Sequence, residues 1–375
     1  MIVFLQGLFL ACFFLGGCYE REPVRIGIAV QLTGKQAELG VQERNAVQLA
    51  VESINGSGGI QGRPVELITR DDLGTPAGAG AAMRDLIAAG VVAVIGPATS
   101  SQAMVEAPMA DNARLVMLSP TVSSPLFSGK DDYFFRVFPT FSKGAYHLAE
   151  SALVNRGVSR IAILYDSDNA AYAGTYAGVF AERFRALGGA ITGEVGFSSR
   201  TEPDFVQMLA KVFAGRPNGI LVIASDDDTA LIAQRTRMRS GDIPIFIANW
   251  AMTETLILNG GKAVEGLEGE QGYDMNSKSP PLADFLARYK ARFGQAPTFG
   301  AAFAYEAADV LAAALRRTGG KPAGLKQALL GTRDFKGLVD TFSFDGYGDV
   351  ERPHYICVIR DGRFATVDVI KRDRP

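Results

Sequence analysis

Short apolar runs rich in β-branched residues alternate with stretches of helical periodicity along this chain, and that alternation limits its fold more than any other feature. Val24–Val30 is the first such run, and residues 40–54 follow it with apolar side chains near a 3.6-residue period. The glycine-rich segment 55–62 ends this helix, since glycine supplies the positive φ angles of tight turns. The repeat predicts parallel sheets covered by helices, an α/β fold.

The repeat occurs in two series that are separated near Pro139. In the first series, strands are also predicted at 65–69, 91–95 and 115–118, with helices at 77–89 and 101–112. In the second, strands are predicted at 160–165, 191–197, 219–224 and 245–248, with helices at 144–155, 172–187, 204–213 and 229–239, and two later helices at 282–293 and 301–317. Residues 355–359 and 364–369 are predicted to form a hairpin, because Asp361-Gly362 between them favours a type I′ turn.

The amino terminus predicts export. Residues 2–15 carry no charge, and this run is shorter than the roughly 20 residues that span a bilayer, so it is typical of a secretory signal. It ends in Leu15-Gly16-Gly17-Cys18, which resembles the lipobox of bacterial lipoproteins. We therefore expect a signal peptide over residues 1–17, lipidation at Cys18 and a linker over 18–23, which would hold the protein on the extracytoplasmic side of a membrane. The alternative is a buried first strand with an incidental cysteine, and the lack of Lys or Arg before Arg21 departs from the usual signal.

Length and composition limit the number of lobes, the partners and the kinds of site that we expect. Removing the first 17 of 375 residues leaves about 358, more than one core usually serves, so two lobes are expected. The formal net charge of −2 gives no reason to expect nucleic acid. Cys12 and Cys18 belong to the predicted signal and lipobox, so Cys357 has no partner for an internal disulfide. The only histidines, His147 and His354, have no ligand spacing, and we expect neither a metal nor a cofactor.

Polar residues follow four of the predicted strands. Because the carboxyl ends of parallel strands meet at one edge of a sheet, these loops are expected to converge where ligands bind in open α/β sheets. Hydroxyls beside free backbone N–H groups suit a carboxylate. The alternatives are that Ser101 and one of the aspartates are helix N-caps, that the Ser/Thr/Pro clusters are ordinary loops, and that Trp250 only packs. The four segments are Gly96-Pro97-Ala98-Thr99-Ser100-Ser101, residues 119–125, Ser225-Asp226-Asp227-Asp228 and Asn249-Trp250.

Several motifs, taken together, carry a resemblance to a known family. From Val24 to about Val369 the chain resembles the type I periplasmic binding proteins, specifically the Leu/Ile/Val-binding branch that feeds ABC importers. The motifs are Arg25-Ile26-Gly27, Leu32-Thr33-Gly34, Ala50-Val51-Glu52-Ser53-Ile54-Asn55 before Gly58-Gly59-Ile60, Val94-Ile95-Gly96-Pro97, Leu118-Ser119-Pro120, Phe135-Arg136-Val137 and Ala304-Tyr305-Glu306-Ala307.

The resemblance implies two Rossmann-like lobes with parallel central sheets, joined by three crossover segments. We place the crossovers near residues 139–141, 268–272 and 344–347. The first lobe would then comprise residues 24–140 and 272–345, and the second residues 141–271 and 346–372. We expect a monomer.

The resemblance also implies a ligand site. By correspondence with the family motifs, Ser100, Thr121 and Ser123 would hold the ligand carboxylate, and Tyr172 would cover the ligand from the second lobe. Leu39 departs from a family aromatic at its position. Thr99, Asp226, Asn249 and Trp250 complete the predicted set, and Trp250 lies at or beside the place where amino-acid binders carry an acid for the ligand ammonium.

An ammonium buried without an anionic partner costs several kcal/mol, so the change to Trp250 leaves three solutions open. Asp226 or Asp227 reaches the ammonium, Trp250 faces it through its ring, or the ligand carries no ammonium. We favour the third, a carboxylate with an apolar or aromatic body against Trp250, because the hydroxyls are kept while the acid is lost.

The expected function is capture by hinge closure, in which the ligand docks on the first lobe and the second closes over it. A permease of an ABC importer in the inner membrane would receive the ligand. A sensor or regulator of the same fold is the first alternative. An enzyme is the other, and it is disfavoured because the sequence has no nucleophile elbow, dinucleotide-binding glycine motif or Walker loop.

Overall fold

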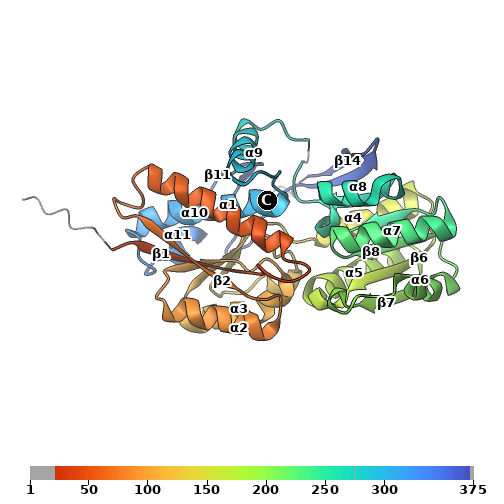
Figure 1. The fold of residues 1–375 in the computed structure, drawn as a ribbon, viewed down its shortest axis with the longest axis horizontal. Helices are drawn as coiled ribbons and strands as arrows, with labels where there is room; N and C mark the ends of the chain where they lie inside the picture. The colour runs from red at the N-terminus through yellow and green to blue at the C-terminus, as the bar shows by residue number, and fades with distance from the viewer. Residues whose placement is uncertain (1–21, 275, 372–375) are drawn as a thin grey trace, which may run out of the picture.

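The computed structural model describes residues 22–274 and 276–371, which form two lobes side by side (Figure 1). The first lobe contains a five-stranded sheet in the order β2-β1-β3-β4-β5, and all its strands are parallel. Its strands are β1 (Val24–Val30), β2 (Val65–Asp71), β3 (Ala93–Ile95), β4 (Val116–Ser119) and β5 (Phe134–Arg136).

Helices from two distant parts of the chain cover this sheet. In Figure 1 α1 lies beside α10, and apolar side chains of both helices share one core with β1 and β3. A small ribbon of β11 (Phe335–Lys336) and β12 (Thr341–Phe342) follows. The helices are α1 (Glu38–Gly56), α2 (Pro76–Ala88), α3 (Ser100–Ala113), α9 (Pro280–Phe293), α10 (Phe299–Thr318) and α11 (Leu325–Leu330).

The second lobe contains a seven-stranded sheet in the order β14-β13-β10-β9-β8-β6-β7. Its strands are β6 (Arg160–Asp166), β7 (Ala190–Phe197), β8 (Gly219–Ile223), β9 (Ile245–Ile247), β10 (Glu268–Gln271), β13 (His354–Arg360) and β14 (Arg363–Ile370). Strands β6 to β10 are parallel, and the β13–β14 hairpin joins β10 antiparallel. Its helices are α4 (Ser142–Glu150), α5 (Ala170–Ala186), α6 (Phe205–Ala214), α7 (Asp226–Ser240) and α8 (Glu254–Gly260).

The α/β fold with parallel central sheets is confirmed, and the predicted hairpin forms with positive φ at Asp361 and Gly362, as a type I′ turn requires. The sequence did not predict β5 or β10. Strand β10 is polar yet buried because its glutamates find partners inside the second lobe. Ser151 donates to Glu268, and Glu270 lies 3.3 Å from His354 Nδ1. Helix α7 of that lobe starts at Asp226 rather than at Thr229 as predicted.

The second crossover lies at the predicted boundary between residues 271 and 272, and the third lies later than predicted. Residues 268–271 form β10 of the second sheet, so the second crossover follows Gln271. After Phe344 the chain stays on the first lobe, because Asp349 pairs with Arg136 and Val350 belongs to the first-lobe core. The third crossover therefore lies between Arg352 and His354, and the predicted start of the second-lobe segment at 346 is wrong for this reason.

The predicted signal peptide and Cys18 lie outside the described residues. Among the described helices, none combines the length and the apolar character needed to cross a bilayer.

Arg352 is the residue on which the last first-lobe segment depends. Its guanidinium is fully buried, donates to Glu306 at 2.6 Å and to Asp340 at 2.7 Å, and lies over the Phe342 ring. Removing one partner of a buried ion pair leaves the other charge uncompensated in the core.

We predict that Arg352→Ala lowers the free energy of unfolding by about 3–5 kcal/mol, measured by urea denaturation. The control is Arg25→Ala, which breaks an exposed pair with Glu66 at 3.0 Å and should cost less than about 1 kcal/mol. Equal losses from the two changes would contradict the assignment.

Candidate ligand-binding cleft

A chamber of about 320 Å³ lies between the lobes at the carboxyl ends of their strands. We call it the hydroxyl chamber, because four hydroxyl-bearing residues from the first lobe form one wall. Its lining residues are Leu39, Ala98, Thr99, Ser100, Thr121, Ser123 and Phe299 from the first lobe and Asn169, Tyr172, Asn249 and Trp250 from the second.

Seven of the eight predicted ligand-binding residues line this chamber, and Asp226 does not. Asp226 and Asp227 line a neighbouring chamber of about 560 Å³ instead. Phe299 and Asn169 were not predicted. Asn169 follows β6 as the other site loops follow their strands, so the sequence held a signal for it, whereas Phe299 comes from the first turn of α10 and gave none.

The loop after β3 presents polar groups that have no partner within the protein. Gly96 has a φ of +116°, and a Cβ there would lie 2.2 Å from the Ala29 carbonyl oxygen, so only glycine fits at the start of this loop. Thr99 is the N-cap of α3, so the alternative that placed Ser101 there is wrong, and the Thr99 side chain makes no capping hydrogen bond. Within the described residues, Thr99 Oγ1 and Ser100 Oγ lack hydrogen-bond partners, and Ser100 is 2% exposed.

A buried hydroxyl without a partner is costly, and these two lie at the N-terminus of a 14-residue helix, where an anion is favoured. The first wall is therefore suited to a carboxylate.

Thr121 differs from Thr99 and Ser100 because its hydroxyl already makes hydrogen bonds within the protein. Thr121 Oγ1 lies 2.7 Å from Glu43 Oε1 and 2.7 Å from the Ala98 carbonyl oxygen. A hydroxyl carries one proton and a carbonyl carries none to donate. The two short contacts are satisfied together only if the Glu43 carboxyl is protonated, donates to Thr121, and Thr121 donates to Ala98.

The burial of Glu43 supports this assignment. Glu43 is fully buried, and burial raises the pKa of its carboxyl to about 8, with Asp72 adding to the effect. Thr121 thus lines the hydroxyl chamber without a free donor, and no ionised carboxylate stands behind that wall.

Tyr172 and Trp250 form the opposing wall. Tyr172, near the start of α5, donates its hydroxyl hydrogen to Asn249 Oδ1, and burial raises its pKa well above the usual range. The Tyr172 ring packs edge-on against Phe141 at 5.4 Å and against Trp250 at 6.1 Å between centroids. This packing fixes both rings, and Trp250 stays partly exposed to the cleft.

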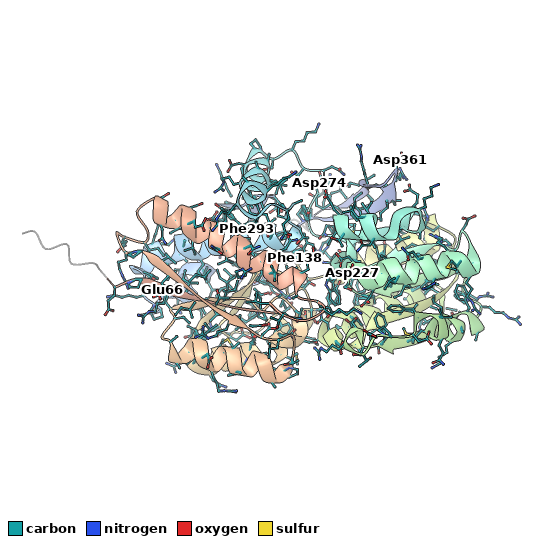
Figure 2. The ribbon with its side chains drawn as sticks, in the orientation of Figure 1. Glu66, Phe138, Asp227, Asp274, Phe293 and Asp361 are labelled. Carbon is teal, nitrogen blue, oxygen red and sulfur yellow. The ribbon has the colours of Figure 1, made fainter. Side chains whose placement is uncertain are left out.

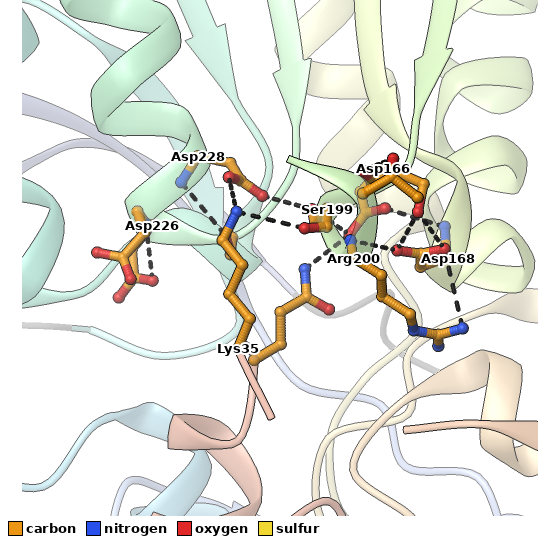
Figure 3. Close-up of polar contacts among 12 residues, drawn as sticks. Lys35, Asp166, Asp168, Ser199, Arg200, Asp226 and Asp228 are labelled. Carbon is orange, nitrogen blue, oxygen red and sulfur yellow. Dashed lines mark hydrogen bonds and ion pairs between the residues drawn. The ribbon is translucent and has the colours of Figure 1, made fainter. Parts of the chain in front are cut away.

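The lobes touch one another around the cleft (Figure 3). Gln36 donates to Asp166 at 2.8 Å, and the Lys35 ammonium lies 3.5 Å from Asp228 and 3.3 Å from the Ser199 carbonyl oxygen. Ser101 N also donates to Asn169 Oδ1 across the cleft at 3.1 Å. The structure therefore describes the closed arrangement of the two lobes.

Other candidate features lie away from the cleft or are structural. Ser225, not an aspartate, is the N-cap of α7, with its side chain accepting from Asp228 N. His147 pairs with Glu150 at 3.4 Å on the surface, whereas His354 is buried. Over residues 22–274 and 276–371, no group of three or more His, Cys, Asp or Glu side chains is arranged to hold a metal ion.

The family follows from a comparison with known proteins. Residues 23–363 match the family model described as periplasmic binding protein. The chain belongs to the periplasmic binding protein family. Members of this family are extracytoplasmic solute-binding proteins.

Relatives of this periplasmic binding protein match most of its length. Leu/Ile/Val-binding protein homolog 3 of Brucella melitensis is 25% identical over 88% of this chain and 90% of the relative. The structure of LivK, a leucine binding protein from Thermotoga maritima, has a TM-score of 0.84 at 25% identity and covers 93% of this chain and 99% of LivK.

A third relative shares the fold alone. It is a solute binding protein of an ABC transporter from Rhodopseudomonas palustris in complex with 3,4-dihydroxybenzoic acid, with a TM-score of 0.84, 23% identity and coverage of 94% of this chain and 99% of that one.

The protonated Glu43 predicts a pH dependence of stability. Its pKa is about 8 in the folded protein and 4.5 for the free side chain, so between these values only the folded state holds the proton. Stability from this group is complete below pH 4.5 and is lost as pH rises through 8, with a slope on the order of 1.4 kcal/mol per pH unit.

We predict that Glu43→Gln, which keeps a donor for Thr121, removes that slope and makes the variant more stable than the wild type near pH 8. Unfolding free energies measured from pH 5 to 8 test this. Asp72, with a pKa raised to about 6, stays in both proteins, so the difference between them reports on Glu43. Parallel curves for the two proteins would show that Glu43 is ionised.

Proposed function

We propose that this periplasmic binding protein captures a small ligand bearing a carboxylate in the hydroxyl chamber and delivers it to the permease of an ABC importer. The observation that carries the proposal is the Ser100 hydroxyl, which is buried, lacks a protein partner and lies at the N-terminus of α3. Ser123 on the same wall is 2% exposed and lines the same chamber. A carboxylate there receives charge-assisted hydrogen bonds in place of the water lost on closure.

The rest of the chamber fits an apolar or aromatic body. Leu39, Phe299 and Trp250 supply apolar surface from both lobes. Among the described residues that line this chamber, none is a carboxylate, so an α-ammonium beside the ligand carboxylate would have no anionic partner. The ligands named for two relatives, leucine and 3,4-dihydroxybenzoic acid, both carry a carboxylate, which is the group that we propose the hydroxyl chamber binds.

Capture proceeds by closure of the lobes around the ligand. The carboxylate docks on Ser100 and Ser123 of the first lobe, and Tyr172, Asn249 and Trp250 of the second lobe then close over the ligand body. Since Ser101 and Asn169 bond across the cleft, closure also orders the loop that carries Ser100. We propose further that the protein acts as a monomer anchored to the membrane through a lipid on Cys18.

The test is a thermal-shift screen of carboxylates and amino acids, followed by calorimetric titration of the compounds that bind. A ligand at 100 times its dissociation constant stabilises the fold by about 2.7 kcal/mol. We expect Ser100→Ala to weaken binding about tenfold or more, because a hydrogen bond to a charged group is worth about 1.5–3 kcal/mol.

Ser57→Ala is the matched control, since Ser57 is exposed at the end of α1, far from the cleft, and should not change affinity. Full affinity in a folded Ser100→Ala protein, or binding only of compounds without a carboxylate, would contradict the proposal.

A further inference from the structure

The second chamber of the cleft is acidic, and its charges come from both lobes. Glu38, the first residue of α1, contributes from the first lobe, and Asp226 and Asp227, in the first turn of α7, contribute from the second. Figure 2 labels Asp227 where the two lobes meet, and Figure 3 shows Asp226 beside the contacts that join them. We call this space of about 560 Å³ the acidic chamber.

The acidic chamber adjoins the hydroxyl chamber. Leu39, Trp250 and Phe299 line both chambers, so these apolar side chains lie between the hydroxyls of the first wall and the carboxylates of the second chamber. An extended ligand that spans these three side chains would reach both ends.

These carboxylates have no cationic partner among the residues that line the chamber. Lys35 is the one cation there, and its ammonium is directed to Asp228 and to a backbone carbonyl. The hydrogen bonds that the acids accept come from neutral groups: Thr253 to Asp226 at 2.5 Å, Asn259 to Asp227 at 2.8 Å, and Gln42 to Glu38 at 3.3 Å.

Closure of the lobes brings like charges together. Glu38 belongs to one lobe and the two aspartates to the other, and in the closed arrangement burial together with Asp226 and Asp227 raises the pKa of Glu38. Burial also raises the pKa of Asp226. Favourable helix dipoles explain why acids occur in the first turns of α1 and α7 separately, but they do not explain why the two sets face each other.

We propose that the acidic chamber binds the positively charged end of the ligand whose carboxylate lies in the hydroxyl chamber. This inference rests on the proposed function, and the buried Ser100 hydroxyl without a protein partner is the separate observation that points to a ligand in the same cleft. The ligand class is a monocarboxylate with an amino or guanidino group several bonds away, at the other end of an apolar spacer. Trp250 borders both chambers, so its ring also lies along the path of the cation.

An α-amino acid with an uncharged side chain does not meet this description. Its ammonium is attached to the carbon next to the carboxylate, so it stays in the hydroxyl chamber, away from the acids. A distant cation instead stands between Glu38 and Asp226 only when the lobes are closed, and it turns their repulsion into attraction. Binding of such a ligand thereby favours the closed state.

The experiment measures dissociation constants by calorimetric titration on the whole protein, with matched compounds. The panel comprises 4-aminobutanoate, 5-aminopentanoate and 6-aminohexanoate, the same acids without the amine, and their 2-amino isomers. We expect at least one terminal-amino acid to bind ten times or more tightly than both its deaminated and its 2-amino counterpart.

Two variants localise the effect. Glu38→Gln and Asp226→Asn should each reduce the preference for the amine several-fold and leave the affinity for the deaminated acid unchanged or higher. The control is Glu66→Gln, an acid at the far side of the first lobe in Figure 2, which should not alter the preference. Melting temperatures of the unliganded variants confirm that each is folded.

The outcomes separate the two proposals. Equal binding with and without the terminal amine, tighter binding of the 2-amino isomers, or a preference that survives both variants would overturn the acidic-chamber inference and leave carboxylate capture standing. If no carboxylate of any class binds, in this panel or in the wider screen, the proposed function itself fails, and the inference with it.

Discussion

Parallel strands place every strand-to-helix loop of a sheet at one edge, and the two sheets of this protein turn those edges toward each other. The whole cleft depends on this constraint. Residues after β3 and β4 form one wall and residues after β6 and β9 form the other, although about 150 positions separate Ser100 from Trp250 in the chain. A strand in the opposite direction would remove its loop from the site. Among the described residues, the antiparallel strands of the two large sheets are β13 and β14, which lie at an edge and contribute nothing to either chamber.

Protonation states divide the cleft into two environments. The Glu43 carboxyl behind Thr121 is neutral because it is fully buried, so it places no negative charge behind the wall where an anion is expected. On the other side of Leu39 and Phe299, three carboxylates stand together without a cation of their own. Carboxyl groups thus stand at both chambers with different charge: burial neutralises Glu43 behind the hydroxyl chamber, whereas the more exposed acids of the acidic chamber keep their charge.

The sequence predicted the lobes and most of the hydroxyl chamber because both depend on local order. Thr99, Ser100, Thr121 and Trp250 each follow closely on a strand whose apolar run is visible, and parallel topology brings them together. Tyr172 was predicted from the resemblance to the family. The resemblance to a family placed the third segment of the chain on the first lobe. The features that the sequence did not predict depend on contacts with residues distant in the chain.

Strand β10 has the polar sequence Glu268–Gln271, and it becomes a buried strand only because Ser151 and His354 satisfy its glutamates. Helix α7 starts three residues earlier than predicted, so Asp226 lies in its first turn, and it lines the acidic chamber rather than the hydroxyl chamber.

The contacts of Lys35 and Gln36 with the second lobe have a consequence for energetics. Neither residue lines the hydroxyl chamber, yet both stabilise the closed arrangement through Asp228 and Asp166. An observed dissociation constant equals the intrinsic one divided by the fraction of protein that is already closed. These two side chains therefore contribute to how tightly every ligand is held. Because both also line the acidic chamber, they affect the charge that a ligand meets there. A change to either residue is expected to alter affinity and selectivity together.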